Sequence, residues 1–218
     1  DFNKSGNSYT LKSNVPYYTS EANTQPGMPK YRDLNGDGVI NTNDCTFIGN
    51  GLPTHTGGFT NNFNYRDFDF SFFFQWSYGN DVLNANRLMF ESSWNRTREL
   101  NQFASYADRW TIDNPTSNIP RATSSSSNRV FSSRIIEDGS FLRLKTLTLG
   151  YTVPRKAISR VGIDQLRIYF AAQNLFTISN YSGYDPEVSI RESALTPGLD
   201  FSAYPRARSF SFGINLGF

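Results

Sequence analysis

A run of twelve residues, Asp33 to Asp44, orders oxygen-bearing side chains and glycines as a calcium-binding loop does. The expected ligands, at loop positions 1, 3, 5, 7, 9 and 12, are Asp33, Asn35, Asp37, the Val39 carbonyl, Asn41 and Asp44. Gly38 permits the sharp turn at position 6, and Ile40 is expected to pack inward. Asp44 stands where the usual loop has Glu, so we expect a weak site. The alternative is an Asx-rich turn that binds no metal.

Aromatic side chains in the second half of the chain could contact a ligand or a partner protein. Tyr181 and Tyr184 share one short block with two carboxylates, a composition that can stack on sugar rings and bind hydroxyl groups. Trp94 and Trp110 provide large rigid rings in another segment. The alternative is that these rings pack loops together or form an interfacial aromatic girdle.

The sequence offers little for catalysis or for nucleic-acid binding. His55 is the only histidine and Cys45 the only cysteine, which leaves no multi-histidine metal site, disulfide or cysteine zinc site. Asp67 and Asp69 are spaced like a carboxylate pair, but lining a polar lumen explains them better than glycosidase chemistry. The formal net charge is only +2, too small to indicate a nucleic-acid partner. We expect that the protein is not an enzyme.

Alternating apolar and polar residues predict an all-β fold. Five strands are expected, at about 57–65, 67–77, 140–152, 164–176 and 206–217. Their apolar faces are rich in Phe, whereas the opposite faces carry Gly, Ser, Asn and Gln, as in a membrane barrel with a polar lumen. The side chains expected to face lipid are Phe70, Phe72, Phe74, Phe210, Phe212, Ile214 and Leu216. The alternation changes phase near Thr146, which predicts a β-bulge there.

The connections between these strands alternate between short and long. Outer-membrane barrels keep short turns on the periplasmic side, so segments 78–139 and 177–205 are expected to lie outside the cell. Short helices are expected at 81–93 and 100–110, and a Ser-rich flexible stretch at 123–128. Five strands cannot close a membrane barrel, which needs at least about eight. Residues 1–218 are therefore expected to be the carboxyl-terminal portion of a larger barrel.

Several motifs together resemble the carboxyl-terminal barrel region of SusC/RagA-type TonB-dependent outer-membrane transporters of Bacteroidota. The segments that carry the resemblance, which spans nearly the whole chain, are 31–38, 65–71, 141–151, 174–176, 181–187 and the terminal Phe218. The resemblance implies an antiparallel transmembrane β-barrel of 22 strands, of which this chain supplies about the last five. It also implies an amino-terminal plug domain and a TonB-contacting segment, both absent from this chain, and a SusD-like lipoprotein lid.

Two functions remain open at this point. The first is part of an active transporter in the Gram-negative outer membrane that imports glycans or oligopeptides with a SusD-like lid and is driven by TonB. Its partners would be the rest of the barrel and plug, TonB and outer-membrane lipid, with no nucleic acid. The alternative is a secreted, calcium-stabilised β-protein that binds carbohydrate.

Overall fold

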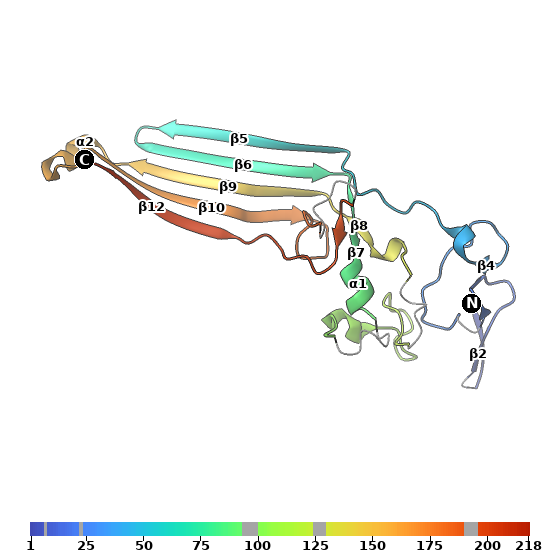
Figure 1. Ribbon diagram of the computed structural model, residues 1–218. Coiled ribbons are helices and arrows are strands. Elements are labelled where there is room, and N and C mark those ends of the chain that lie inside the picture. Colours follow the sequence, from blue (N-terminus) through green and yellow to red (C-terminus); the bar gives the residue numbers. More distant parts are fainter. Residues whose placement is uncertain (7, 22–23, 93–99, 124–129, 190–195) are drawn as a thin grey trace. The chain divides into compact units, whose positions relative to one another are not determined.

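The computed structural model describes residues 1–218 except 7, 22–23, 93–99, 124–129 and 190–195 (Figure 1). The chain divides into two compact units. Unit 1 consists of residues 1–49, 83–136 and 200–202, and unit 2 of residues 50–82, 137–199 and 203–218.

Unit 2 is built on a five-stranded antiparallel sheet with the order β12-β10-β9-β6-β5 (Figure 1). Its strands are β5 (His55–Tyr65), β6 (Phe68–Tyr78), β9 (Phe141–Thr152), β10 (Gln165–Ser179) and β12 (Ser209–Gly217). Consecutive strands of the sheet are therefore neighbours, as in a meander. All five strands expected from the alternating pattern are confirmed, with ends that differ by at most three residues.

The connections explain this simple order. Arg66 and Asp67 alone join β5 to β6, and Tyr65 pairs with Phe68 at the closed end of the hairpin. Helix α2 (Arg155–Ile158) and the 3₁₀ helix η7 (Ser159–Val161) occupy the connection between β9 and β10. Short connections of this kind place antiparallel strands side by side.

A β-bulge interrupts the sheet where the alternation changes phase. Phe73 pairs with Thr146 of β9, whereas Phe74 pairs with Leu144, so Lys145 is the extra residue. On the other side of β9, the register to β10 shifts between Gln173 and Phe176. The bulge expected near Thr146 is confirmed, and it keeps apolar residues on one face both before and after it.

Unit 1 contains small elements with little regular sheet. Strands β1 (Phe2–Ser5) and β2 (Ser8–Leu11) form a hairpin, and β3 (Tyr17–Tyr18) pairs in parallel with β4 (Val39–Ile40). Helices in the described part of this unit include η2 (Thr42–Asp44), α1 (Ala85–Phe90), η4 (Ala104–Asp108) and η6 (Ser133–Ile135). Buried Glu91 binds the guanidinium groups of Arg87 and Arg134 at the end of α1.

A three-stranded sheet has the order β11-β7-β8, with β7 at Asp81–Asn84, β8 at Ile136–Asp138 and β11 at Leu199–Asp200. The expected helix over 81–93 is wrong at its start, because its first four residues form β7. Val82 is completely buried in this strand, and the Asn84 side chain accepts a hydrogen bond from Arg87 N–H, which starts α1 only at Ala85. Tertiary pairing has overridden the helical pattern.

The helix expected over 100–110 is also shorter than predicted. Within that range only Ala104–Asp108 is helical, and it is a 3₁₀ helix. Trp110 N–H donates to the Ile119 carbonyl at 2.9 Å, which draws the backbone away from a helical path. Residues 124–128 of the expected Ser-rich stretch lie outside the described residues.

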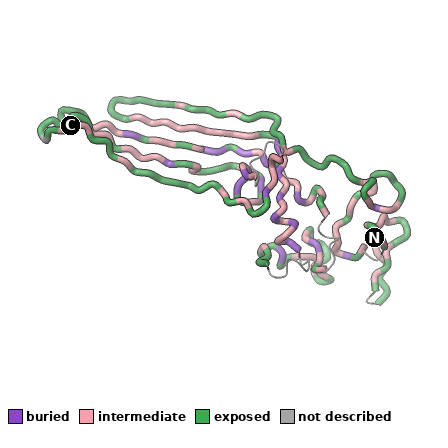
Figure 2. The backbone as a smooth tube through the Cα atoms, viewed as in Figure 1, coloured by how far each residue is buried: buried purple, intermediate pink, exposed green. Residues whose placement is uncertain are grey.

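Burial is unevenly distributed within unit 2 (Figure 2). The two outer strands, β5 and β12, are exposed along most of their length, and the central strand β9 holds buried residues. Its fully buried Arg143 is 2% exposed. In the described part of unit 2, most residues of the outer strands are exposed, and the buried residues of the sheet lie on its inner strands β9 and β10.

Candidate functional site

One face of the five-stranded sheet is predominantly apolar from edge to edge. Asn61 of β5, which pairs with Phe72, is a polar residue on this face. Residues that pair directly across antiparallel strands project on the same face, so the register identifies its members. These are Phe59, Phe63 and Tyr65 of β5; Phe68, Phe70, Phe72, Phe74 and Trp76 of β6; Leu142, Leu144, Leu147, Leu149 and Tyr151 of β9; Leu166, Ile168, Phe170, Ala172, Phe176 and Ile178 of β10; and Phe210, Phe212, Ile214 and Leu216 of β12. All seven side chains expected to face lipid belong to this apolar face.

Much of this face is open to the surroundings. On β12, Phe212 is 82% exposed and Ile214 is 64% exposed. Neighbouring rings contact one another across the strands, as between Phe170 and Phe212, whose centroids lie 5.0 Å apart. A continuous, uncovered aromatic surface of this kind requires an apolar environment.

Rings with polar groups stand at both ends of the apolar face. At one end the His55 ring stacks on Tyr78, and Trp76 Nε1 donates to His55 Nδ1 at 3.2 Å. At the other end Tyr151 packs against Phe68, with centroids 4.6 Å apart. Such amphipathic rings are typical of the two interfaces of a membrane-embedded sheet.

The opposite, polar face carries a charge pair that the sequence did not reveal. Arg167 of β10 binds Asp69 of β6 through two hydrogen bonds, Nε to Oδ1 at 3.0 Å and the terminal guanidinium nitrogen to Oδ2 at 2.6 Å. Asp67 lies in the turn before β6, so the expected carboxylate pair is separated between turn and strand. Asp69 has a cationic partner instead.

A second network fastens the segment around 185–187 onto the same polar face. The Arg143 guanidinium donates to Asp185 Oδ1 at 2.5 Å, to Glu187 Oε2 at 3.0 Å and to Thr177 Oγ1 at 3.0 Å. Arg206 also reaches Glu187 Oε2, at 3.1 Å. Asp185 and Glu187, the two carboxylates expected from the sequence to bind sugar hydroxyls, are therefore bound to cations of the protein itself.

Asp185 is held in its charged form by this network. Burial raises the pKa of its carboxyl, but hydrogen bonds from Glu187 N–H, Arg143 and Arg206 N–H outweigh that effect, so the pKa lies below the ordinary value. Both Asp185 and Arg143 are buried, at 4% and 2% exposure. Each buried charge therefore depends on the other.

The aromatic side chains expected to contact a ligand or partner differ in their surroundings. Tyr184 is 79% exposed, whereas Tyr181 is buried and its ring lies against Gly183. In unit 1, Trp110 packs on Gly27 and lies 5.8 Å from the Arg121 guanidinium. The Tyr184 ring is thus accessible, whereas Trp110 packs within unit 1, and the contact roles of these residues stay predictions. Trp94 lies outside the described residues.

The loop expected to bind calcium is closed by its own hydrogen bonds. The Asp33 carboxylate accepts from Gly36 N–H at 2.6 Å and Gly38 N–H at 2.8 Å. Asp44 accepts from Leu34 N–H and Asn41 N–H, both at 2.8 Å, and these bonds lower the pKa of its carboxyl. The carboxylates at the two ends of the loop, Asp33 and Asp44, thus both accept hydrogen bonds from backbone N–H groups within it.

The other expected ligands make similar short bonds. Asn35 Nδ2 donates to Asp37 Oδ2 at 2.9 Å, and Asn41 Nδ2 donates to the Val39 carbonyl at 3.2 Å. Within the described residues, no three His, Cys, Asp or Glu side chains are grouped closely enough to hold a metal ion. The expected donor set has only three carboxylates and otherwise uses amides and a carbonyl. Calcium binding stays a prediction.

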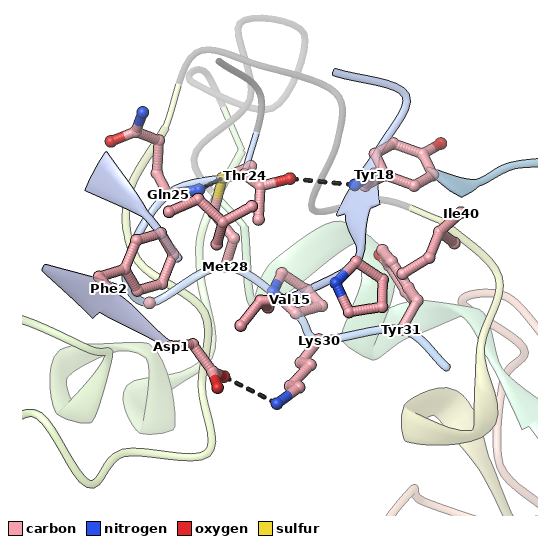
Figure 3. Close-up of a pocket in the computed structure, with 14 residues that line it drawn as sticks. Asp1, Phe2, Val15, Tyr18, Thr24, Gln25, Met28, Lys30, Tyr31 and Ile40 are labelled. Carbon is pink, nitrogen blue, oxygen red and sulfur yellow. Dashed lines mark hydrogen bonds and ion pairs between the residues drawn. The ribbon is translucent and has the colours of Figure 1, made fainter. Parts of the chain in front are cut away.

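The loop leads into a small pocket of unit 1, with a volume of about 160 Å³ (Figure 3). Ile40 lies at its wall and is 7% exposed, which confirms that this residue packs inward. Tyr31 also lines the pocket, and burial, the largest effect, raises the pKa of its hydroxyl. A hydrogen bond from Tyr18 N–H to Thr24 Oγ1, at 3.0 Å, closes one side.

In the described part of the chain, no helix is both long enough and apolar enough to cross a membrane.

No protein-family model matches the chain. It is 35% identical over 205 residues to TonB-dependent receptor P3 of Formosa agariphila, a match that covers 92% of this chain and 20% of the relative. It is 30% identical over 200 residues to TonB-dependent receptor SusC of Bacteroides thetaiotaomicron, covering 91% of this chain and 18% of the relative.

Solved structures of a related transporter have the same fold. The RagAB peptide importer in its closed-closed state matches with a TM-score of 0.69 at 25% identity, over 88% of this chain and 21% of that chain. The RagAB peptide transporter matches with a TM-score of 0.64 at 28% identity, over 77% of this chain and 17% of that chain. The chain spans about one fifth of the length of the relatives it matches. These matches confirm the resemblance indicated by the sequence motifs.

Proposed function

We propose that this chain, a relative of the SusC/RagA-type TonB-dependent receptors, forms part of the barrel wall of a nutrient transporter in the Gram-negative outer membrane of Bacteroidota. The observation that carries the proposal is the apolar face of the five-stranded sheet, which is continuous across all its strands. Lipid is the environment that such a face requires, and the polar face would line the lumen. A secreted carbohydrate-binding protein would leave these rings in water.

The two outer strands of the sheet support a larger barrel. Strands β5 and β12 each have one neighbour within this sheet, which leaves one backbone edge of each strand without a ladder partner in it. An open edge in hydrocarbon costs several kcal/mol for each unsatisfied group. The remainder of the transporter would pair with both edges and complete a barrel of about 22 strands.

The connections support an orientation for the sheet. The turn between β5 and β6 and the segment between β9 and β10 are short, and they would lie in the periplasm. Segments 78–139 and 177–205 would then lie outside, where a SusD-like lipoprotein would cover the barrel mouth. The relatives named TonB-dependent receptors support TonB as the energy source. The cargo would be a glycan or an oligopeptide, and RagAB is named a peptide importer.

A bound calcium ion would stabilise the loop from Asp33 to Asp44 in unit 1. One Ca²⁺ ion bound by Asp33, Asn35, Asp37, the Val39 carbonyl, Asn41 and Asp44 would add ligation to a loop that is ordered mainly by its own hydrogen bonds. Its role would be structural, because the loop contains no group suited to catalysis.

Adjacent residues on β12 provide a direct test of the proposed membrane position. In the complete transporter with its native cysteines replaced, a nitroxide label would be placed at Phe212→Cys or at Ser211→Cys. We expect oxygen in the lipid phase to relax the label at 212, and a water-soluble nickel chelate to relax the label at 211. Relaxation of both labels by the nickel chelate alone would contradict a membrane position.

Orientation needs a separate experiment. Protease added to intact cells should cleave within segment 78–139 if that segment lies outside the cell. Cleavage that appears only after the outer membrane is permeabilised would reverse the proposed orientation.

A further inference from the structure

A pocket of about 350 Å³ opens on the polar face of the sheet in unit 2. Its wall includes Thr56, Gln75 and Ser77, from the ends of β5 and β6, and its other side is formed by Glu187 and Ser189. Thr56 pairs with Ser77 across the two strands, so both project on the polar face. The volume falls within the ~300–1,000 Å³ of small-molecule sites.

Among the described residues, the only carboxylate that lines this pocket belongs to Glu187, and its charge is already neutralised. Glu187 Oε2 accepts from Arg143 at 3.0 Å and lies 3.1 Å from Arg206 Nε, and its Oε1 lies 3.8 Å from Lys145 Nζ. Lys145 also donates to Gln75 Oε1 at 2.5 Å. The other polar side chains in the described lining are hydroxyls, amides and the indole of Trp76. A charged ligand would have to displace these internal partners, whereas a neutral one would not.

The rim of the pocket is tightly packed. A side chain at Gly51 would place its Cβ 2.6 Å from the Pro197 carbonyl oxygen. Gly198 has a φ of +69°, and its Cβ would lie 2.5 Å from the Asp81 carbonyl oxygen. Both glycines line the pocket. Segments that approach one another this closely leave little room for this side of the pocket to collapse, which favours a pre-formed site here.

The backbone at the pocket floor is unsuited to extended peptides. Strand β6 is paired on both sides, by β5 and by β9. A peptide that binds as an added strand needs a free sheet edge, because main-chain hydrogen bonds supply most of its affinity. The groups that remain are side-chain hydroxyls and amides, which can both donate and accept, beside the apolar surfaces of Pro186 and Val188.

We propose that this pocket is a binding subsite for an uncharged, hydroxyl-rich glycosyl residue of the cargo. Sugar hydroxyls donate and accept as the lining groups do, and the C–H faces of a sugar ring suit the proline and valine surfaces. The inference rests on the proposed transport function, because the pocket would face the lumen only if the apolar face contacts lipid. Residues Thr56, Gln75, Ser77 and Ser189 would provide the hydrogen bonds.

The test replaces one exposed wall residue in the complete transporter, produced in cells that lack the native gene. Thr56→Trp would fill the pocket from β5. Thr60→Trp is the matched control, because Thr60 is also exposed, lies on the same face of the same strand and does not line the pocket. Equal amounts of both variants in the outer-membrane fraction would establish that both fold.

Growth would be measured on limiting starch, inulin, laminarin or xylan, and on a tryptic digest of casein, with the deletion strain beside each variant. We expect deletion to abolish growth on at least one of these neutral glycans. We expect Thr56→Trp to raise the concentration for half-maximal growth on it about tenfold, equivalent to about 1.4 kcal/mol. Thr60→Trp should match the wild type.

Three outcomes would overturn the inference. If deletion abolishes growth only on the peptide digest, the ligand class is wrong while the transport function stands. If deletion abolishes growth on a glycan but both tryptophan variants grow like the wild type, the pocket is not the subsite. If deletion affects none of the substrates, the proposed import of these nutrients fails, and the subsite fails with it.

Discussion

Arg167 reaches Asp69 from two strands away by crossing directly over Gly150. Arg167 lies on β10 and Asp69 on β6. Gly150 on the intervening strand β9 pairs with Asp69 on one side and with Tyr169, two residues along β10 from Arg167, on the other. A Cβ at position 150 would lie 2.3 Å from Asp69 Oδ1 and 2.5 Å from the Arg167 guanidinium. The glycine thus leaves room for the charge pair, which joins β10 to β6 across β9 on the face proposed to line the lumen.

Gly150→Ala should destabilise the sheet, because the new methyl group overlaps both partners of the ion pair. Overpacking of this kind costs ~1–3 kcal/mol. Gly217→Ala on β12 is the control, since its Cβ would meet Gln165 Cβ at an ordinary 3.4 Å. Urea unfolding of the purified transporter in detergent, followed by tryptophan fluorescence, measures both. Equal midpoints for the two variants would show that the crossing tolerates a methyl group.

Phe212→Arg should cost ~2–4 kcal/mol if residue 212 lies near the bilayer midplane. The guanidinium would have to enter hydrocarbon from a side chain that is 82% exposed on the apolar face. Ser211→Arg, one residue away on the polar face, should change stability by less than about 1 kcal/mol because it enters a water-filled lumen. Unfolding and refolding in lipid vesicles gives both values. The same cost at both positions would contradict the assignment of the two faces.

The sheet was predictable from the sequence because its pattern is strong and local. On β12, Phe210, Phe212 and Ile214 alternate with small and polar residues without a break, and the phase change near Thr146 marked the bulge. The segment that begins at Asp81 was mistaken for helix. A short apolar run can suit either structure, and its pairing partners decide between them.

The charge networks could not be predicted because they depend on tertiary position. Arg143 and Asp185 are separated by 42 positions in the sequence, and Arg167 and Asp69 by 98. Nothing in local spacing shows that the segment holding Asp185 folds onto the polar face. A glycine within a strand does indicate close approach by another group, so Gly150 was an available signal.

Asp185→Ala should destabilise unit 2, because it leaves one arm of the buried Arg143 guanidinium without its carboxylate. Removing one member of a buried ion pair costs ~3–5 kcal/mol. Asp164→Ala removes a pair with Arg155 whose side chains are 62% and 74% exposed. That change should cost at most ~1 kcal/mol. Guanidinium unfolding of the two variants in detergent would compare them, and equal costs would mean that the buried network contributes no more than a surface pair.

The same carboxyl should set the acid stability of the segment around Asp185. Its folded-state pKa is lowered, so its contribution is fully present above the unfolded value of ~3.9 and is lost as the pH falls through the folded value. A nitroxide label at Tyr184→Cys should therefore be equally immobile at pH 7 and pH 5, and more mobile at pH 3. With Asp185→Asn added, mobility should not change between pH 5 and pH 3. Loosening between pH 7 and pH 5 would point to a different titrating group.

Calcium should bind the loop from Asp33 to Asp44 with a dissociation constant of ~10⁻⁴ to 10⁻³ M, the range of extracellular modules. The set of three carboxylates and the short Asp44 side chain at the last position both favour the weak end of calcium affinities. Isothermal titration calorimetry on the complete purified transporter, after treatment with chelator, measures this constant. Asp33→Asn should weaken binding beyond detection, whereas Asp113→Asn, at an exposed position away from the loop, should leave it unchanged.

The metal-free alternative gives the opposite result in the same experiment. The loop already satisfies its carboxylates with backbone N–H groups, as at Asp33 and Asp44. If those bonds alone order it, calcium will release no heat at millimolar concentrations. Amide hydrogen exchange at Gly36, Gly38 and Val39 would then be slow both with and without calcium. If calcium orders the loop, exchange at these amides should slow as the ion is added, and Asp33→Asn should abolish that protection.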